Sequence, residues 1–172
     1  VKKIGQTPSP LNYFTICHSK LDAGVQITAS HNPKEDNGIK LQLRDAEAFS
    51  GDDLQELRRG IESGQWLQVA EERGAVEDLD AISIYIETLV KTFRGVGTGM
   101  HVVVDGGNGV AGPVYGEVLR RSGAQVTELY TEPDGEFPNH PADPSKHSTL
   151  VELQKKVQDC KANFGLAYDG DG

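Results

Sequence analysis

The fold class of this chain follows from residues 100–130, which read MHVVVDGGNGVAGPVYGEVLRRSGAQVTELY. Residues 100–104 form an apolar run that is typical of a parallel strand buried on both faces. Residues 113–122 carry apolar side chains at helical spacing, and Gly123 marks the end of that helix. Residues 124–130 predict the next strand. A strand, a helix and a strand in this order indicate a parallel βαβ unit.

The alternation continues toward the end of the sequence. A further helix is predicted where Leu150, Leu153 and Val157 share one face, and residues 164–168 predict a third strand. The chain from residue 98 onward therefore predicts an α/β domain built on a mainly parallel sheet.

Two carboxylates follow that third strand, in the sequence Asp169-Gly170-Asp171-Gly172. Ligands of open α/β sheets gather at the carboxyl ends of the strands, and glycines let the backbone turn tightly there. Closely spaced carboxylate oxygens suit Mg²⁺ or Ca²⁺. The alternative interpretation is a plain acidic turn.

Residues 1–97 predict a second α/β region, and the glycine-rich stretch 95–99 is the predicted boundary. The predicted elements are a helix from Pro10, strands at 24–27 and 39–43, a helix beginning at Ser50 and a helix capped by Asp78 or Asp80. Apolar stripes mark the two later helices: Leu54, Leu57 and Ile61 in one, and Ile82, Ile86, Leu89 and Phe93 in the other. Trp66 is predicted to pack under a loop.

Composition and charge narrow the class of protein. The 172 residues are 37% hydrophobic and 25% charged, with a net charge of −9, which argues against a nucleic-acid or anionic-membrane partner. No apolar run approaches the roughly 20 residues of a membrane span, and no signal peptide is predicted. Cys17 and Cys160 lie far apart in the sequence, so a reduced cytoplasmic setting is predicted, with one disulfide as the alternative.

The most reactive side chains gather between the strands at 24–27 and 39–43. The loop reads Thr28-Ala29-Ser30-His31-Asn32-Pro33-Lys34-Glu35-Asp36-Asn37-Gly38, and Lys40 follows in the next strand. Proline and glycine fix the path of the loop, since the first restricts φ and the second allows conformations that other residues avoid. Such a loop suits a nucleophile or a phosphate carrier. A solvated turn that contains a serine is the alternative.

Thr-Ala-Ser-His-Asn-Pro followed by Asn-Gly-Ile-Lys resembles the active-site loop of the α-D-phosphohexomutases. That family includes phosphomannomutase/phosphoglucomutase and phosphoglucosamine mutase. Its loop serine carries a phosphoryl group, so the resemblance implies this role for Ser30. The lysine after Asn-Gly-Ile is the family's candidate general base and acid, which implies that role for Lys40 and requires a lowered pKa for base work. His31 is implied to hydrogen-bond within the loop or to phosphate, with a structural role as the alternative.

The family's metal loop has the form Asp-Gly-Asp-Gly-Asp, and Asp169 and Asp171 match its first two aspartates. The sequence stops before the third. The resemblance implies Mg²⁺ held by these carboxylates and by the phosphoserine at Ser30. It also implies the reaction, in which the phosphoserine donates to a hexose phosphate, a hexose 1,6-bisphosphate reorients, and the enzyme takes back the other phosphate. Hexose 1-phosphate and hexose 6-phosphate, of mannose or glucose, thereby interconvert.

The resemblance covers nearly the whole chain and implies two incomplete three-layer α/β domains with mainly parallel sheets. Residues 1–97 would be the latter part of the first domain, and residues 98–172 most of the second, in a four-domain protein. Residues 133–144, PDGEFPNHPADP, are similar to the bacterial phosphomannomutase/phosphoglucomutase branch, with phosphoglucosamine mutase as the alternative. As a fragment, the chain is expected to be inactive alone and to self-associate through an uncovered sheet edge or face in its first region.

A competing motif lies at residues 107–112, where GNGVAG matches GxGxxG between a strand and a helix. Glu128 falls at a tolerable distance to contact a ribose. Taken alone, the motif predicts a dinucleotide-binding oxidoreductase domain. Asp105 argues against it, because its carboxylate would lie beside the pyrophosphate. A non-enzymatic binding module built on the same sheet is a third interpretation.

Overall fold

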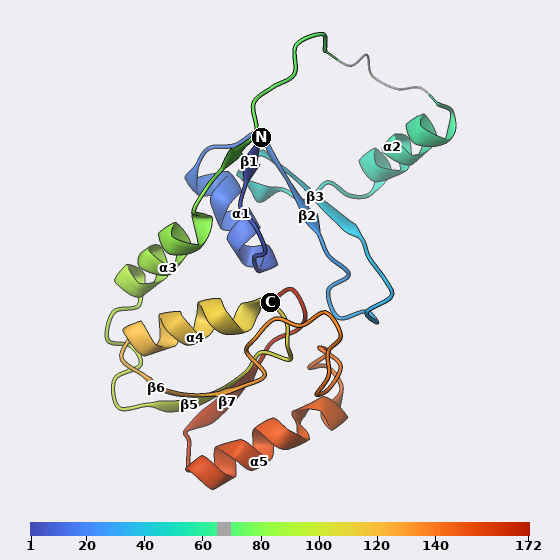
Figure 1. Cartoon of the computed structure of the whole chain (residues 1–172). Coiled ribbons are helices and arrows are strands. Elements are labelled where there is room, and N and C mark those ends of the chain that lie inside the picture. The colour runs from blue at the N-terminus through green and yellow to red at the C-terminus, as the bar shows by residue number, and fades with distance from the viewer. Residues whose placement is uncertain (65–69) are drawn as a thin grey trace.

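A three-stranded parallel sheet in the order β6–β5–β7 organises the second half of the chain. The central strand β5 (His101–Asp105) pairs with β6 (Gln125–Leu129) on one side and β7 (Phe164–Ala167) on the other. Helices α4 (Ala111–Arg121) and α5 (Val151–Cys160) cover opposite faces of the sheet (Figure 1). This arrangement confirms the parallel α/β sheet predicted from the alternation of strands and helices.

The core of this half is the central strand itself. Val102, Val103 and Val104 are at most 1% exposed, as expected for a parallel strand that is covered on both faces. Val102 and Val104 pack with Ala124 in one apolar cluster. The carboxyl ends of the three strands lie at one edge of this core, and the loops that leave them form one side of the candidate site.

The first half contains two small sheets. β1 (Lys2–Lys3) runs parallel to β4 (Glu77–Asp78), and β2 (Ala23–Ile27) runs antiparallel to β3 (Ile39–Leu43). The remaining elements are α1 (Ser9–His18), α2 (Asp52–Glu62), α3 (Ala81–Thr92) and two short 3₁₀ turns at Arg44–Ala46 and His147–Leu150. The structure, a computed structural model, describes residues 1–64 and 70–172, so the prediction for Trp66 lies outside the described residues.

Helix α3 joins the two halves. The carboxylate of Asp80 accepts a hydrogen bond from the Ser83 N–H, which confirms the predicted cap of this helix. One apolar cluster combines α1, α3 and α4 through four buried residues, Leu11, Ala81, Tyr85 and Val114. The division of the chain at residue 97 stays a prediction, and α3 packs against helices on both sides of it.

Two apolar surfaces of the first half face solvent. On the β2–β3 hairpin these side chains are Val25, Ile27, Ile39 and Leu43, with exposures of 58%, 61%, 65% and 39%. The stripe predicted on α2 is present as Leu54, Leu57 and Ile61, but each is more than 40% exposed.

The predicted Ser50 cap of helix α2 is wrong, because Gly51 occupies the N-cap and no side chain bonds there.

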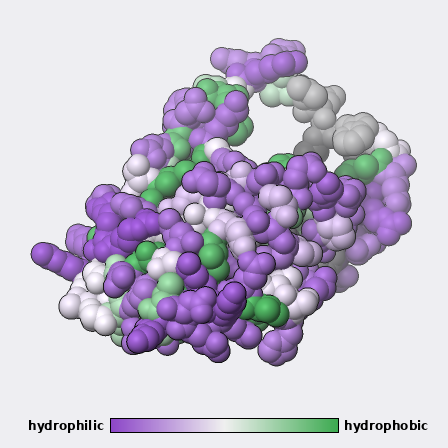
Figure 2. All heavy atoms as spheres, turned by 60° about the horizontal axis from the view of Figure 1, so that its bottom comes forward, coloured by the Kyte–Doolittle hydropathy of each residue, from purple (hydrophilic) through white to green (hydrophobic). Residues whose placement is uncertain are grey.

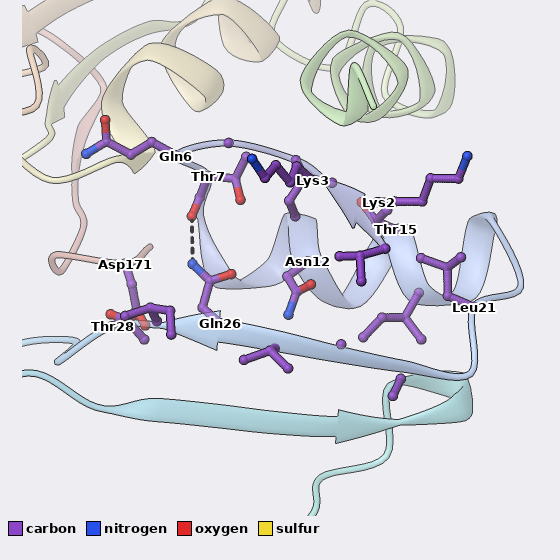
Figure 3. A pocket seen from close by; sticks show the side chains of 18 of the residues that line it. Lys2, Lys3, Gln6, Thr7, Asn12, Thr15, Leu21, Gln26, Thr28 and Asp171 are labelled. Atoms are coloured by element: carbon purple, nitrogen blue, oxygen red, sulfur yellow. Dashed lines mark hydrogen bonds between the residues drawn. The ribbon is translucent and has the colours of Figure 1, made fainter. Parts of the chain in front are cut away.

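A groove of about 1000 Å³ separates β1 from β2, with α1 along one side. In Figure 3, Thr7, Asn12 and Gln26 project into this region, and the Gln26 side-chain amide donates to the Thr7 carbonyl at 3.1 Å. Thr28 and Asp171 line the end of the groove (Figure 3). Figure 2 shows another face of the molecule, on which hydrophilic side chains predominate and apolar ones form small separate patches.

None of the helices in residues 1–64 and 70–172 is long and apolar enough to cross a membrane. Cys17 and Cys160 are both free thiols, so the disulfide considered from the sequence is not formed.

Candidate functional site

Ser30 lies at the tip of the β2–β3 hairpin, where its hydroxyl meets two carboxylates from the far end of the sequence. Its backbone is in the left-handed region, with φ at 55°, which is uncommon for a residue with a side chain. The backbone N–H donates to the Thr28 hydroxyl at 2.9 Å and helps to fix this conformation. The Ser30 hydroxyl lies 2.7 Å from Asp169 Oδ2 and 3.1 Å from Asp171 Oδ1. Because a hydroxyl has one proton, it donates to one carboxylate at a time.

Gly170 allows the two loops to approach each other. A Cβ atom at this position would lie 2.5 Å from the Ser30 carbonyl oxygen, which is far inside van der Waals contact. The glycine predicted to permit a tight turn between two aspartates therefore also permits direct contact with the serine loop. The Gly170 carbonyl accepts from the Val110 N–H at 3.2 Å, which ties the loop to the start of α4.

Lys40 completes the cluster from strand β3. Its Nζ lies 2.6 Å from Asp171 Oδ2. Burial lowers the pKa of Lys40, but the hydrogen bond and charge of Asp171 outweigh that effect, so the pKa is raised. Base work by Lys40 would require a lowered pKa, whereas this arrangement raises it. Lys40 is held as a cation, which suits it to donate a proton or to bind an anion.

Asp171, at 6% exposed, is more buried than Ser30, Lys40 and Asp169. Burial raises the pKa of its carboxyl, but hydrogen bonds from Lys40, Ser9 and Thr28 outweigh burial and lower the pKa. The Ser9 hydroxyl donates to Asp171 Oδ2 at 2.8 Å. Sequence reasoning did not identify Ser9, and the only signal available was the Thr-Pro-Ser-Pro cluster at the start of its helix.

His31 follows Ser30 and is exposed. It lines a cavity of about 300 Å³ together with Asp143 and Asp169. Beside it, Lys34 forms an ion pair with Glu136 at 2.5 Å, which joins the serine loop to the segment after β6. This ion pair was also absent from the sequence predictions. The structure places His31 beside Ser30 and Asp169, and its role stays a prediction.

The donor set of the site fits a hard divalent cation. Two carboxylates and one hydroxyl converge, all through oxygen, as Mg²⁺ prefers. Within residues 1–64 and 70–172, no group of three or more His, Cys, Asp or Glu side chains could hold a metal ion. The described residues thus bring three oxygen atoms together, and a fuller coordination shell needs water, phosphate oxygens or further protein groups.

The glycine-rich motif at residues 107–112 does not offer a phosphate cradle. A dinucleotide site needs free backbone N–H groups at this turn, but the N–H groups of residues 106–110 are all engaged within the protein. Their acceptors, in chain order, belong to Leu129, Asp105, Tyr130, Gly106 and Gly170. The buried Asp105 carboxylate also lies 3.1 Å from His140 Nε2. Glu128, the predicted ribose contact, pairs with Arg120. These contacts remove the basis for the dinucleotide interpretation.

Two family descriptions match the chain. Residues 1–68 match "Phosphoglucomutase/phosphomannomutase, alpha/beta/alpha domain I", and residues 83–172 match "Phosphoglucomutase/phosphomannomutase, alpha/beta/alpha domain II". A phosphomannomutase/phosphoglucomutase of Pseudomonas aeruginosa is 37% identical over the whole chain. A phosphoglucomutase of Neisseria gonorrhoeae is 35% identical over 99% of the chain, and a probable phosphoglucosamine mutase of Methanopyrus kandleri is 36% identical over 99%.

Solved structures agree with these matches. A crystal structure of a phosphoglucomutase/phosphomannomutase family protein from Burkholderia thailandensis is 33% identical, with a TM-score of 0.90 over the whole chain and 38% of its own length. A putative phosphomannomutase from Thermus thermophilus is 25% identical, with a TM-score of 0.76 over 99% of the chain and 39% of its own length. The chain spans 36% of the Pseudomonas and Neisseria relatives and 38% of the Methanopyrus relative.

Proposed function

Because the chain belongs to the phosphoglucomutase/phosphomannomutase family, we propose that it forms part of a phosphohexomutase that interconverts hexose 1-phosphate and hexose 6-phosphate. Ser30 carries the phosphoryl group, and a hexose 1,6-bisphosphate is the intermediate. The observation that carries the proposal is the convergence of the Ser30 hydroxyl with Asp169 and Asp171, which lie 139 and 141 residues away in the sequence. A solvated turn would not require such partners.

The groups that can accept or donate a proton at the site support the roles of the side chains. A serine hydroxyl is a weak nucleophile and needs a nearby proton acceptor, and Asp169 Oδ2 is the nearest such atom, at 2.7 Å. Lys40 is held as a cation by Asp171. It can therefore protonate the oxygen that leaves the phosphoryl group, whereas base work requires its ion pair with Asp171 to open. His31 and Lys34 add donors for phosphate oxygens around the loop.

Asp169, Asp171 and the oxygen of Ser30 would hold Mg²⁺. When bound, the ion offsets the charge of the transferring phosphoryl group and orients it. A phosphosugar is anionic, whereas the chain has a net charge of −9. Local positive charge at Lys40 and at the metal site therefore has to supply the attraction.

The names of the relatives favour glucose and mannose phosphates as substrates. A phosphoglucosamine mutase remains the second candidate, because the Methanopyrus relative that carries this description is as similar as the others, at 36% identity. Turnover of glucose 1-phosphate, mannose 1-phosphate and glucosamine 1-phosphate by the natural polypeptide that contains this sequence, called the parent chain below, distinguishes the two.

The role of Ser30 is tested by incubating the parent chain with a hexose 1,6-bisphosphate and mapping phosphate by mass spectrometry. One phosphate is expected on Ser30, and the variant Ser30→Ala should incorporate none and lose mutase turnover. Ser63→Ala is the matched control, because Ser63 is an exposed serine at the end of α2 whose hydroxyl donates to the Gly60 carbonyl. Phosphate on another residue, or full turnover in Ser30→Ala, would reject the assignment.

A further inference from the structure

We propose that Ser9 is a positioning residue that fixes the Asp171 carboxylate for the metal and the serine. This inference rests on the proposed function, since it concerns the orientation of a proposed metal ligand. Ser9 is 4% exposed and lies at the first residue of α1, 162 residues before Asp171. Its hydroxyl bonds to Asp171 and not to Ser30, so it acts through Asp171.

Two hydrogen bonds join the residues. The Ser9 N–H donates to the Asp171 carbonyl at 2.8 Å, and the Ser9 hydroxyl donates to Asp171 Oδ2 at 2.8 Å. The first N–H groups of a helix have no partner within it, so this one is available to a neighbouring loop. Pro8 and Pro10 flank Ser9, and the φ of each proline is fixed by its ring. One residue thus holds both the main chain and the side chain of Asp171.

The hydroxyl bond decides which carboxylate oxygen faces the serine. Asp171 Oδ2 receives the Ser9 hydroxyl at 2.8 Å and Lys40 Nζ at 2.6 Å, and the Thr28 side chain also bonds to this carboxylate. Asp171 Oδ1 lies 3.1 Å from the Ser30 hydroxyl. Donors on Oδ2 from two different elements prevent the carboxylate from rotating about its last torsion. The lone pairs of Oδ1 therefore stay directed at the reacting centre.

A positioning role and a purely structural role make different predictions. Ser9→Ala removes only the hydroxyl and keeps the bond from the backbone N–H. Ser9→Thr keeps a hydroxyl at the same atom. Thr15→Val is the matched control on the same helix, because the Thr15 hydroxyl is equally buried, at 3% exposed, and donates to the Leu11 carbonyl at 2.7 Å without touching Asp171.

The experiment is a calorimetric titration of the parent chain and these three variants with Mn²⁺ alone. Loss of a hydrogen bond to a metal ligand typically weakens metal affinity about 10–100-fold, and we expect a loss in that range for Ser9→Ala. Ser9→Thr and Thr15→Val should each lose far less affinity than Ser9→Ala, because the first keeps a hydroxyl for Asp171 and the second changes a hydroxyl that donates to Leu11. Unchanged affinity in Ser9→Ala, or an equal loss in Thr15→Val, would overturn the inference.

Failure of this inference is separable from failure of the proposed function. Phosphate incorporation at Ser30 reports the function without any titration of metal. A parent chain that takes phosphate on Ser30 and binds Mn²⁺ equally well with and without the Ser9 hydroxyl would overturn only the role of Ser9. A parent chain that binds no Mn²⁺ would overturn the role of Ser9 together with the proposed metal site.

Discussion

The site depends on single atoms that approach closely. Gly170 is the clearest case, because its missing side chain lets the aspartate loop lie against the Ser30 carbonyl. A residue with a Cβ at this position would push the Ser30 hydroxyl away from both carboxylates.

We predict that Gly170→Ala destabilises the chain by roughly 1–3 kcal/mol, as overpacking commonly does, and abolishes phosphate incorporation at Ser30. Thermal unfolding and peptide mapping measure the two effects. Gly135→Ala is the control, because a Cβ there meets nothing within 4 Å. Normal incorporation in Gly170→Ala would show that the loops can separate without loss of function.

Asp143 gives a prediction for pH. Hydrogen bonds from Ser145 and Lys146 lower the pKa of this carboxyl to about 2. The unfolded value is about 3.9, so the unfolded chain takes up the proton first as the solution is acidified. The stability due to Asp143 is therefore complete above about pH 4 and is lost as the pH falls toward 2. Urea unfolding between pH 2 and 5 should show a weaker pH dependence for Asp143→Asn. An unchanged profile would mean that the carboxylate contributes nothing.

At this scale the sequence singled out the side chains that converge and missed the residues that support them. Ser30, Lys40, Asp169 and Asp171 each stand in a short ordered motif, and the structure brings them together. Ser9 belongs to no motif that describes its partner, which lies 162 residues away. The raised pKa of Lys40 was not predictable either, because it depends on the short distance to Asp171.

At the scale of the elements, the sequence patterns predicted where strands and helices lie. They did not predict which apolar faces are covered by other elements. Periodicity placed α2 and its apolar stripe correctly, yet the stripe faces solvent. A periodic pattern states which face of a helix is apolar and not what packs on it. Likewise, the antiparallel pairing of β2 with β3 follows from the loop between them, whereas the exposure of the hairpin's outer face does not.

We predict that the 172-residue polypeptide self-associates through the apolar face of the β2–β3 hairpin, because contiguous exposed apolar area favours association. Light scattering coupled to size exclusion should give a mass that rises with concentration. Val25→Thr combined with Ile39→Thr should shift the distribution toward monomer while keeping β-branched side chains in the strands.

Val151→Thr is the matched control for this experiment, because Val151 is 59% exposed but lies on α5, in the other half of the chain. A monomer at all concentrations, or an equal effect of the control, would contradict the role of the hairpin face.

At the scale of the whole molecule, the described residues bring three oxygen donors for a cation together. Mg²⁺ demands near-octahedral coordination. We therefore predict that the 172-residue polypeptide binds Mg²⁺ more weakly than the parent chain and shows no mutase turnover, since positioning of the sugar phosphate dominates phosphoryl transfer. Calorimetry and a coupled assay with glucose 1-phosphate measure both. Equal affinity and turnover in the two polypeptides would refute this prediction.

The separation of 139 residues between Ser30 and Asp169 in the sequence also sets the interval between their synthesis on the ribosome. A ribosome adds about 5–20 residues per second, so roughly 7–30 s separate the synthesis of the hydroxyl from that of its acceptor. During that interval the serine hairpin exists on the nascent chain without the aspartate loop that later holds it. The Ser30 hydroxyl is thus made first, and it meets its carboxylates only when β7 has joined the sheet.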